Sequence, residues 1–171
     1  MATLAQELGE SSHCSALLIS ARGTGLKSTA DFIKLAVARG CSHYAPAYPP
    51  LEHDPGNAAI SNEELVALLL LGSNEFEPIA IRCAAQLAGG CNAKQLAQVA
   101  KRERVSRTLA YIAKAGSMHD SSHKDFWDEL LGLLGEQPPV ADGVLPHWSR
   151  FVSQTGVTRY GGGRVQWLHC R

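Results

Sequence analysis

The residues with the clearest chemical potential are the cations of residues 92–114. This stretch carries six basic side chains against a single acid, Glu103, although the whole chain has no net charge. Clustered guanidinium and ammonium groups bind phosphate oxygens, and nucleic acids present those oxygens in a dense row. We therefore expect a surface for nucleic acid here, next to the acidic stretch 115–142. The six cations are Lys94, Lys101, Arg102, Arg104, Arg107 and Lys114.

Periodicity divides this stretch into two helices. The apolar residues of 93–100 form one stripe, and those of 105–113 form another that lies roughly 150° further round a helix axis. One straight helix cannot bury both stripes against one core. We therefore expect a break near 102–104, with Ser106 as the N-cap of the second helix and Gly116 at its end. Asn92 and Gln95 supply the capping pattern of the first helix.

Residues 95–112, QLAQVAKRERVSRTLAYI, resemble the helix-turn-helix of the lactose-repressor and arabinose-regulator families. Those families pair an L-A-x-x-A helix with a short turn and a V-S or M-S dipeptide that opens the recognition helix. Here Val99-Ala100 stand six positions before Val105-Ser106, as the pattern requires. Arg104 occupies the turn position that glycine usually holds, so it must adopt a backbone conformation that glycine prefers. Leu109 also comes one position earlier than the families place their apolar residue.

The resemblance implies a role for each polar side chain. Arg102, Arg104 and Arg107 would contact phosphates, and Thr108 or Tyr111 would reach base edges. Separately, the segment Arg159-Tyr-Gly-Gly-Gly-Arg164 could form a wing-like turn on a phosphate backbone, although a plain surface hairpin is the simpler interpretation. The predicted contacts are Lys94, Lys101, Arg102, Arg104, Arg107, Thr108, Tyr111, Arg159 and Arg164.

A second phosphate-binding pattern lies within residues 17–29. Lys27-Ser28 follow two glycines and precede an expected helix, whose first amides would favour an anion. The first glycine of the G-x-x-x-x-G-K-S motif is missing, however, and Leu26 separates Gly25 from Lys27. We therefore do not expect nucleotide binding.

The histidines raise the question of metal chemistry. His119 and His123 are four residues apart, a spacing that lets two helical side chains reach one metal. His119 precedes the expected cap at 121–122, so we interpret the pair as exposed side chains at a helix start. A third ligand would have to come from Asp120, His43 or His53. We predict no metal, cofactor or catalytic residue, and an enzyme built from these histidines is the remote alternative to a non-catalytic module.

The elements that position these side chains are predicted to be mainly α-helical. Capping signals place helices from Ser28 to Gly40, from Ser61 to 71 and from Pro78 to 88, and an amphipathic pattern places another over 121–134. Two short runs, 151–153 and 165–169, flank three glycines and can form a small hairpin. Segments 2–9 and 14–21 are too short for periodicity to choose between helix and strand. The expected fold is a single-domain bundle of five or six helices with a small C-terminal β-hairpin.

We divide the chain into a helical domain, 1–146, and a C-terminal extension, 147–171. Four prolines exclude a helix from 41–60, a long loop that Tyr44, Tyr48 and Leu51 allow to pack. This loop, or the aromatic side chains of the tail, could instead bind another protein. A protein-interaction subunit is therefore the main alternative to nucleic-acid binding.

Composition limits the setting in which the chain works. It is 45% hydrophobic and 19% charged, values typical of folded globular proteins. The longest apolar run, 65–71, is far shorter than the about 20 residues that a membrane span needs, so no membrane partner is expected. Five scattered cysteines without a C-x-x-C pair are typical of free thiols in a reducing cytosol, which predicts a cytoplasmic location.

Overall fold

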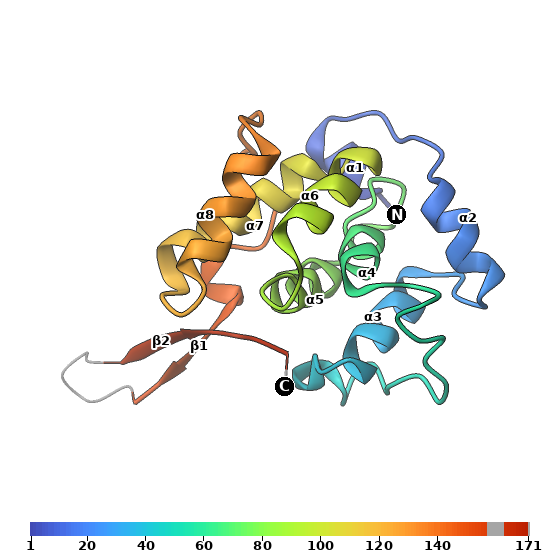
Figure 1. The fold of residues 1–171 in the computed structure, drawn as a ribbon, viewed down its shortest axis with the longest axis horizontal. Coiled ribbons are helices and arrows are strands. Elements are labelled where there is room, and N and C mark those ends of the chain that lie inside the picture. The colour runs from blue at the N-terminus through green and yellow to red at the C-terminus, as the bar shows by residue number, and fades with distance from the viewer. Residues whose placement is uncertain (157–162, 171) are drawn as a thin grey trace.

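Short helices joined by tight turns make up most of the structure (Figure 1). The computed structural model describes residues 1–156 and 163–170. Within them the α-helices are α1 (Leu4–Leu8), α2 (Ala16–Gly23), α3 (Thr29–Ala38), α4 (Asn62–Leu69), α5 (Pro78–Ala88), α6 (Ala93–Arg102), α7 (Ser106–His119) and α8 (Lys124–Leu134). The remaining elements are the 3-10 helices η1 (Ser42–Tyr44) and η2 (Trp148–Arg150) and the strands β1 (Val152–Thr155) and β2 (Arg164–Trp167). No helix among the described residues is long and apolar enough to cross a bilayer.

The mainly α class and the small C-terminal hairpin are confirmed, and the helix count exceeds the predicted five or six. The two additional helices, α1 and α2, are the short segments that periodicity left undecided. Each has a local cap: the Thr3 side chain accepts from the Gln6 amide, and the Ser15 side chain accepts from the Leu18 amide. Such caps stabilise helices that are too short to form alone.

Most predicted helix ends are where the capping residues placed them. Ser28 and Ser61 form capping boxes at the starts of α3 and α4, and the Asn92 side chain accepts from the Gln95 amide at the start of α6. The start of α7 was predicted wrongly, because its N-cap is Val105 and Ser106 is already helical. Its end was also wrong: the helix passes through Gly116 and continues to His119.

Gly116 has a packing role instead of ending its helix. A Cβ atom there would lie 2.7 Å from Trp127 Nε1, and closer still to the ring carbons Cδ2 and Cε2. Trp127 belongs to α8 and is fully buried. The glycine therefore lets α8 approach α7 closely enough for the indole to pack against the α7 backbone.

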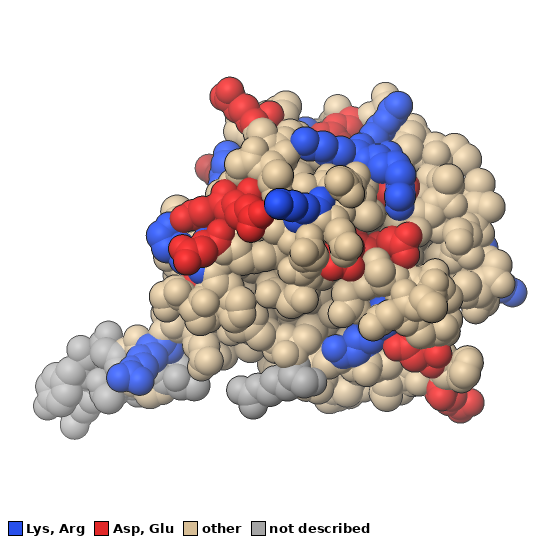
Figure 2. All heavy atoms as spheres, viewed as in Figure 1, with Lys and Arg blue, Asp and Glu red and all other residues tan. Residues whose placement is uncertain are grey.

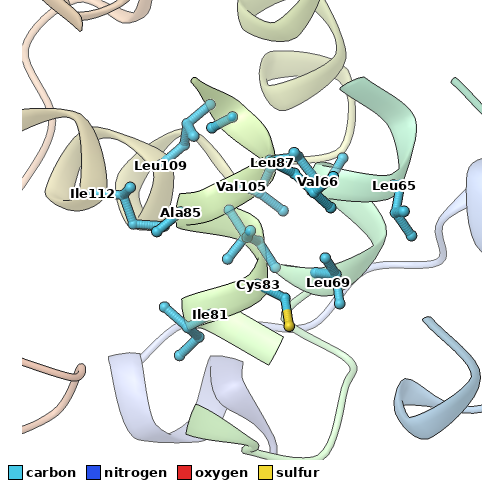
Figure 3. Close-up of a cluster of buried hydrophobic side chains, with 14 of the residues drawn as sticks. Leu65, Val66, Leu69, Ile81, Cys83, Ala85, Leu87, Val105, Leu109 and Ile112 are labelled. Carbon is cyan, nitrogen blue, oxygen red and sulfur yellow. The ribbon is translucent and has the colours of Figure 1, made fainter. Parts of the chain in front are cut away.

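Helix α5 is the buried centre that its apolar pattern predicted (Figure 1). Figure 3 shows Cys83 and Leu87 of α5 among Leu65 and Leu69 of α4, with Leu109 of α7 on the other side. The side chains of this cluster are almost entirely removed from water. Burial of such apolar area is the main stabilising contribution to the fold, at about 25 cal/mol per Å².

The tail docks on the helices through its aromatic residues. Strands β1 and β2 pair antiparallel, with Val152 opposite Trp167. The Trp167 indole is buried and donates to the Ala85 carbonyl oxygen of α5 at 3.2 Å. Phe151 is also buried, and Trp148 packs against the core. These aromatic side chains therefore contribute mainly to internal packing.

The proline-rich loop 41–60 is packed against the core. Tyr44 is buried, and Tyr48 and Leu51 pack on the core from partly exposed positions. Arg39, at the end of α3, donates two hydrogen bonds of 2.9 Å to the Asp54 carboxylate and a third of 2.8 Å to the Ile60 carbonyl oxygen. The Arg39 guanidinium group thus holds the C-terminal part of the loop, from Asp54 to Ile60, against the end of α3.

Candidate functional site

Four exposed cations form what we call the α6 basic surface. Helix α6 is amphipathic: Leu96, Val99 and Ala100 are buried, so the polar residues face solvent. Figure 2 shows blue spheres gathered over the region of α6 and its following turn, and red spheres over neighbouring α8. The four cations are Lys94, Lys101 and Arg102 of α6 and Arg104 of the turn.

Nearby acids neutralise part of this surface. Arg102 Nε lies 2.9 Å from Glu103 Oε1, and Arg102 Nη2 lies 3.8 Å from Glu64 Oε1. The Arg102 side chain is still 58% exposed, so it can contact an external anion as well. Across the residues that the structure describes, no ion pair involves Lys94, Lys101 or Arg104.

The turn between α6 and α7 has the backbone that the motif requires. Arg104 has φ +57°, and it is the only non-glycine residue with positive φ in the described part of the chain. For a residue with a side chain, this left-handed conformation costs about 1–2 kcal/mol. It turns the chain sharply after α6 and leaves the Arg104 side chain exposed.

The start of α7 is covered by the chain's own segments. Arg107 donates to the carbonyl oxygens of Leu8, Pro138 and Pro139 at 2.6–3.2 Å, and it also contacts Glu10 Oε1 at 2.9 Å. These contacts hold the segment after α8 and the end of α1 against α7. The guanidinium group is therefore already engaged within the molecule.

Thr108 and Tyr111, the predicted base-reading residues, are also engaged. Thr108 is only 2% exposed. The Tyr111 hydroxyl donates to the Pro146 carbonyl oxygen at 3.0 Å, and burial raises the pKa of this hydroxyl. Thr108 is thus removed from the surface, and the Tyr111 hydroxyl already has a partner within the molecule. Of the predicted contacts in residues 92–114 other than Lys114, the four cations of the α6 basic surface are the exposed ones.

The arginines of the tail are separate from this surface. Arg164 is exposed on β2, and Figure 1 shows the hairpin extending at the lower left, away from α6 near the upper centre. Arg159 lies outside the described residues. The structure thus does not bring Arg164 together with the cations of α6.

The other sequence patterns do not gather into one site. Asp31 accepts from the Lys27 and Ser28 amides at 3.0 Å, so its carboxylate already occupies the anion position of the phosphate-loop-like segment. These hydrogen bonds lower the pKa of Asp31 although partial burial alone would raise it. His43 and His53 are exposed in the loop, and His119 stacks on Trp148 with ring centroids 3.8 Å apart. The histidine-based enzyme site is therefore not assembled from the residues that suggested it.

Comparison with models of protein families, with curated proteins and with solved structures found no match to this chain. A functional assignment must therefore rest on the α6 basic surface and its contacts. Sequence reasoning missed Glu10 and Glu64, the acids that meet Arg107 and Arg102. Neither lies within one helical turn of its partner, so no local spacing could have indicated the pairs.

Proposed function

We propose that this protein binds the phosphate backbone of nucleic acids through the α6 basic surface. The observation that carries the proposal is the exposure of four cations on one helix face and its turn, three of them without an ion pair among the described residues. Contacts to phosphates do not depend on sequence. We therefore expect binding without base specificity, because Thr108 is buried and the Tyr111 hydroxyl is bonded to the Pro146 carbonyl oxygen.

The charges of the neighbouring helix define where the nucleic acid would lie. Asp125, Asp128 and Glu129 are exposed on α8, and Lys124 pairs with Asp128 at 2.7 Å. Like-charge repulsion should keep a phosphate backbone away from α8 and over α6 and its turn. At most four cations can then contact phosphates. For duplex DNA each contact contributes about 0.9 to the slope of log K against log salt, so the slope should be no steeper than about −3.6.

The test is fluorescence anisotropy of labelled duplex DNA and labelled single-stranded RNA at several salt concentrations. We compare the wild type with Lys101→Gln/Arg104→Gln. The matched control is Arg22→Gln/Lys27→Gln, which removes the same charge from exposed positions on α2 and the turn after it. The first variant should lose affinity and flatten the salt slope by about 1.8, while the control keeps the wild-type slope.

Two results would overturn the proposal. One is the absence of binding to either nucleic acid at low salt. The other is an equal loss in both double variants, which would mean that net charge, rather than this surface, determines binding.

A further inference from the structure

A cluster of nitrogen and oxygen donors lies at the turn between α7 and α8, apart from the α6 basic surface. Asp120 directly follows α7, His123 directly precedes α8, and His169 comes from the tail just after β2. One donor atom from each of the three residues lies within 4.8 Å of the other two. The cluster borders a cavity of about 320 Å³, lined by Gln86, Gly89, Gly90, His123, His169 and Cys170.

The distances fit a single small cation. Asp120 Oδ2 lies 3.1 Å from His169 Nε2 and 3.5 Å from His123 Nδ1. Ligands held at about 2.0–2.1 Å around a tetrahedral ion lie about 3.4 Å from one another. The three atoms can therefore reach one centre with small movements of the side chains.

The carboxylate is buried and held in place from both sides. Asp120 is 2% exposed. Its Oδ1 accepts from the Ser122 hydroxyl at 2.7 Å, and its Oδ2 accepts from the buried Trp127 indole at 2.9 Å. Hydrogen bonds of this kind orient the ligands of protein metal sites. Gly116 contributes indirectly, because it leaves the space that the Trp127 ring fills.

His169 directs its Nε2 nitrogen at the same point. This atom is buried and lies 3.1 Å from Asp120 Oδ2. The Nδ1 atom of the same ring faces α5, where a Cβ at Gly89 would lie 2.9 Å away. The absence of a side chain at Gly89 therefore leaves room for the imidazole in this position.

We propose that Asp120, His123 and His169 bind one divalent transition-metal ion of the Zn²⁺ type. Two imidazoles and one carboxylate suit Zn²⁺ or Co²⁺, whereas Mg²⁺ and Ca²⁺ prefer all-oxygen sites. Three protein ligands leave a fourth position for water or another small ligand on the side of the cavity. Cys170 is not part of this set, because its Sγ contacts Cys41 Sγ at 3.1 Å.

The test is isothermal titration of the chelator-treated, untagged full chain with ZnCl₂ and with CoCl₂, and with MgCl₂ for comparison. We expect one Zn²⁺ or Co²⁺ per chain and a higher melting temperature with metal. His123→Ala and His169→Gln should each lower the affinity by about a hundredfold or more. The control His43→Ala removes an exposed histidine outside the cluster and should bind as the wild type does.

The cysteines are tested separately, since thiolates also bind Zn²⁺. Cys41→Ser/Cys170→Ser should keep the metal affinity. The visible spectrum of the Co²⁺-loaded wild type gives a readout that does not depend on any variant folding, and it should show four-coordinate cobalt without thiolate charge transfer. Absence of Zn²⁺ and Co²⁺ binding, binding that survives loss of His169, or a thiolate–cobalt band would each overturn the proposal.

Discussion

Replacing Gly116 by alanine sets two physical effects against each other. Gly116 lies inside α7, where alanine is preferred to glycine by about 1 kcal/mol on helix propensity alone. The added methyl group, however, would overlap the Trp127 ring, which is fully buried and has no space into which it can move freely. Overpacking of a core typically costs about 1–3 kcal/mol, and a rigid buried indole calls for the upper end of that range. The net effect should be a loss of about 2 kcal/mol.

Gly132 provides the matched control. It also lies inside a helix, α8, but no atom lies within 4 Å of a Cβ built at that position. Gly132→Ala should therefore raise the free energy of unfolding by up to about 1 kcal/mol, because the higher helix propensity of alanine is not opposed by a steric clash. For a chain of this size each kcal/mol shifts the melting temperature by about 2–4 °C. Gly116→Ala should melt about 4–8 °C lower than the wild type, and Gly132→Ala slightly higher.

The assay is thermal unfolding followed by circular dichroism, together with Trp fluorescence of the native state. If both alanine variants are stabilised, the close packing of Trp127 on α7 is not present in solution and the reasoning fails. If Gly116→Ala is destabilised, its Zn²⁺ affinity should fall as well, because the Trp127 indole orients Asp120.

Three further predictions concern single residues. Arg104→Gly should raise stability by about 1 kcal/mol in thermal melts, whereas Arg104→Ala should not, because only glycine relieves the cost of φ +57°. Arg107→Lys keeps the charge but loses most of the hydrogen bonds to carbonyl oxygens; it should lower stability by about 1–3 kcal/mol and speed proteolysis near residue 138, with the salt slope of nucleic-acid binding unchanged. Asp54→Asn should destabilise the protein at neutral pH. Hydrogen bonds from Arg39 lower the folded-state pKa of Asp54, although burial raises it. The contribution of Asp54 to the free energy of unfolding is therefore fully present above its unfolded pKa of about 3.9 and is lost as the pH falls through its lower folded-state pKa. The difference between Asp54→Asn and the wild type in denaturant titrations should therefore shrink in acid.

Among the described residues, the sequence by itself determined six of the eight α-helices, all but α1 and α2, and the break between two of them. Capping residues such as Ser28, Ser61 and Asn92 act on amides two or three positions away, so a short window contains both partners. The break before α7 was predicted because two apolar stripes would lie on different sides of one continuous helix. The left-handed backbone of Arg104 was expected from the resemblance to the helix-turn-helix families, which have glycine at this position. The exposure of the α6 cations followed in the same way from amphipathicity.

The tertiary structure alone decided which of these side chains are available. Nothing near Arg107 indicates that Pro138 and Pro139 will cover it, and nothing near His123 indicates that its neighbour is His169 rather than His119. In the sequence His119 and His123 are the histidines four residues apart, but His119 stacks on Trp148 while the tail brings His169 to Asp120. The reason is physical: caps and periodicity are interactions between near neighbours in the chain, whereas these contacts join segments that only the packing of the core brings together.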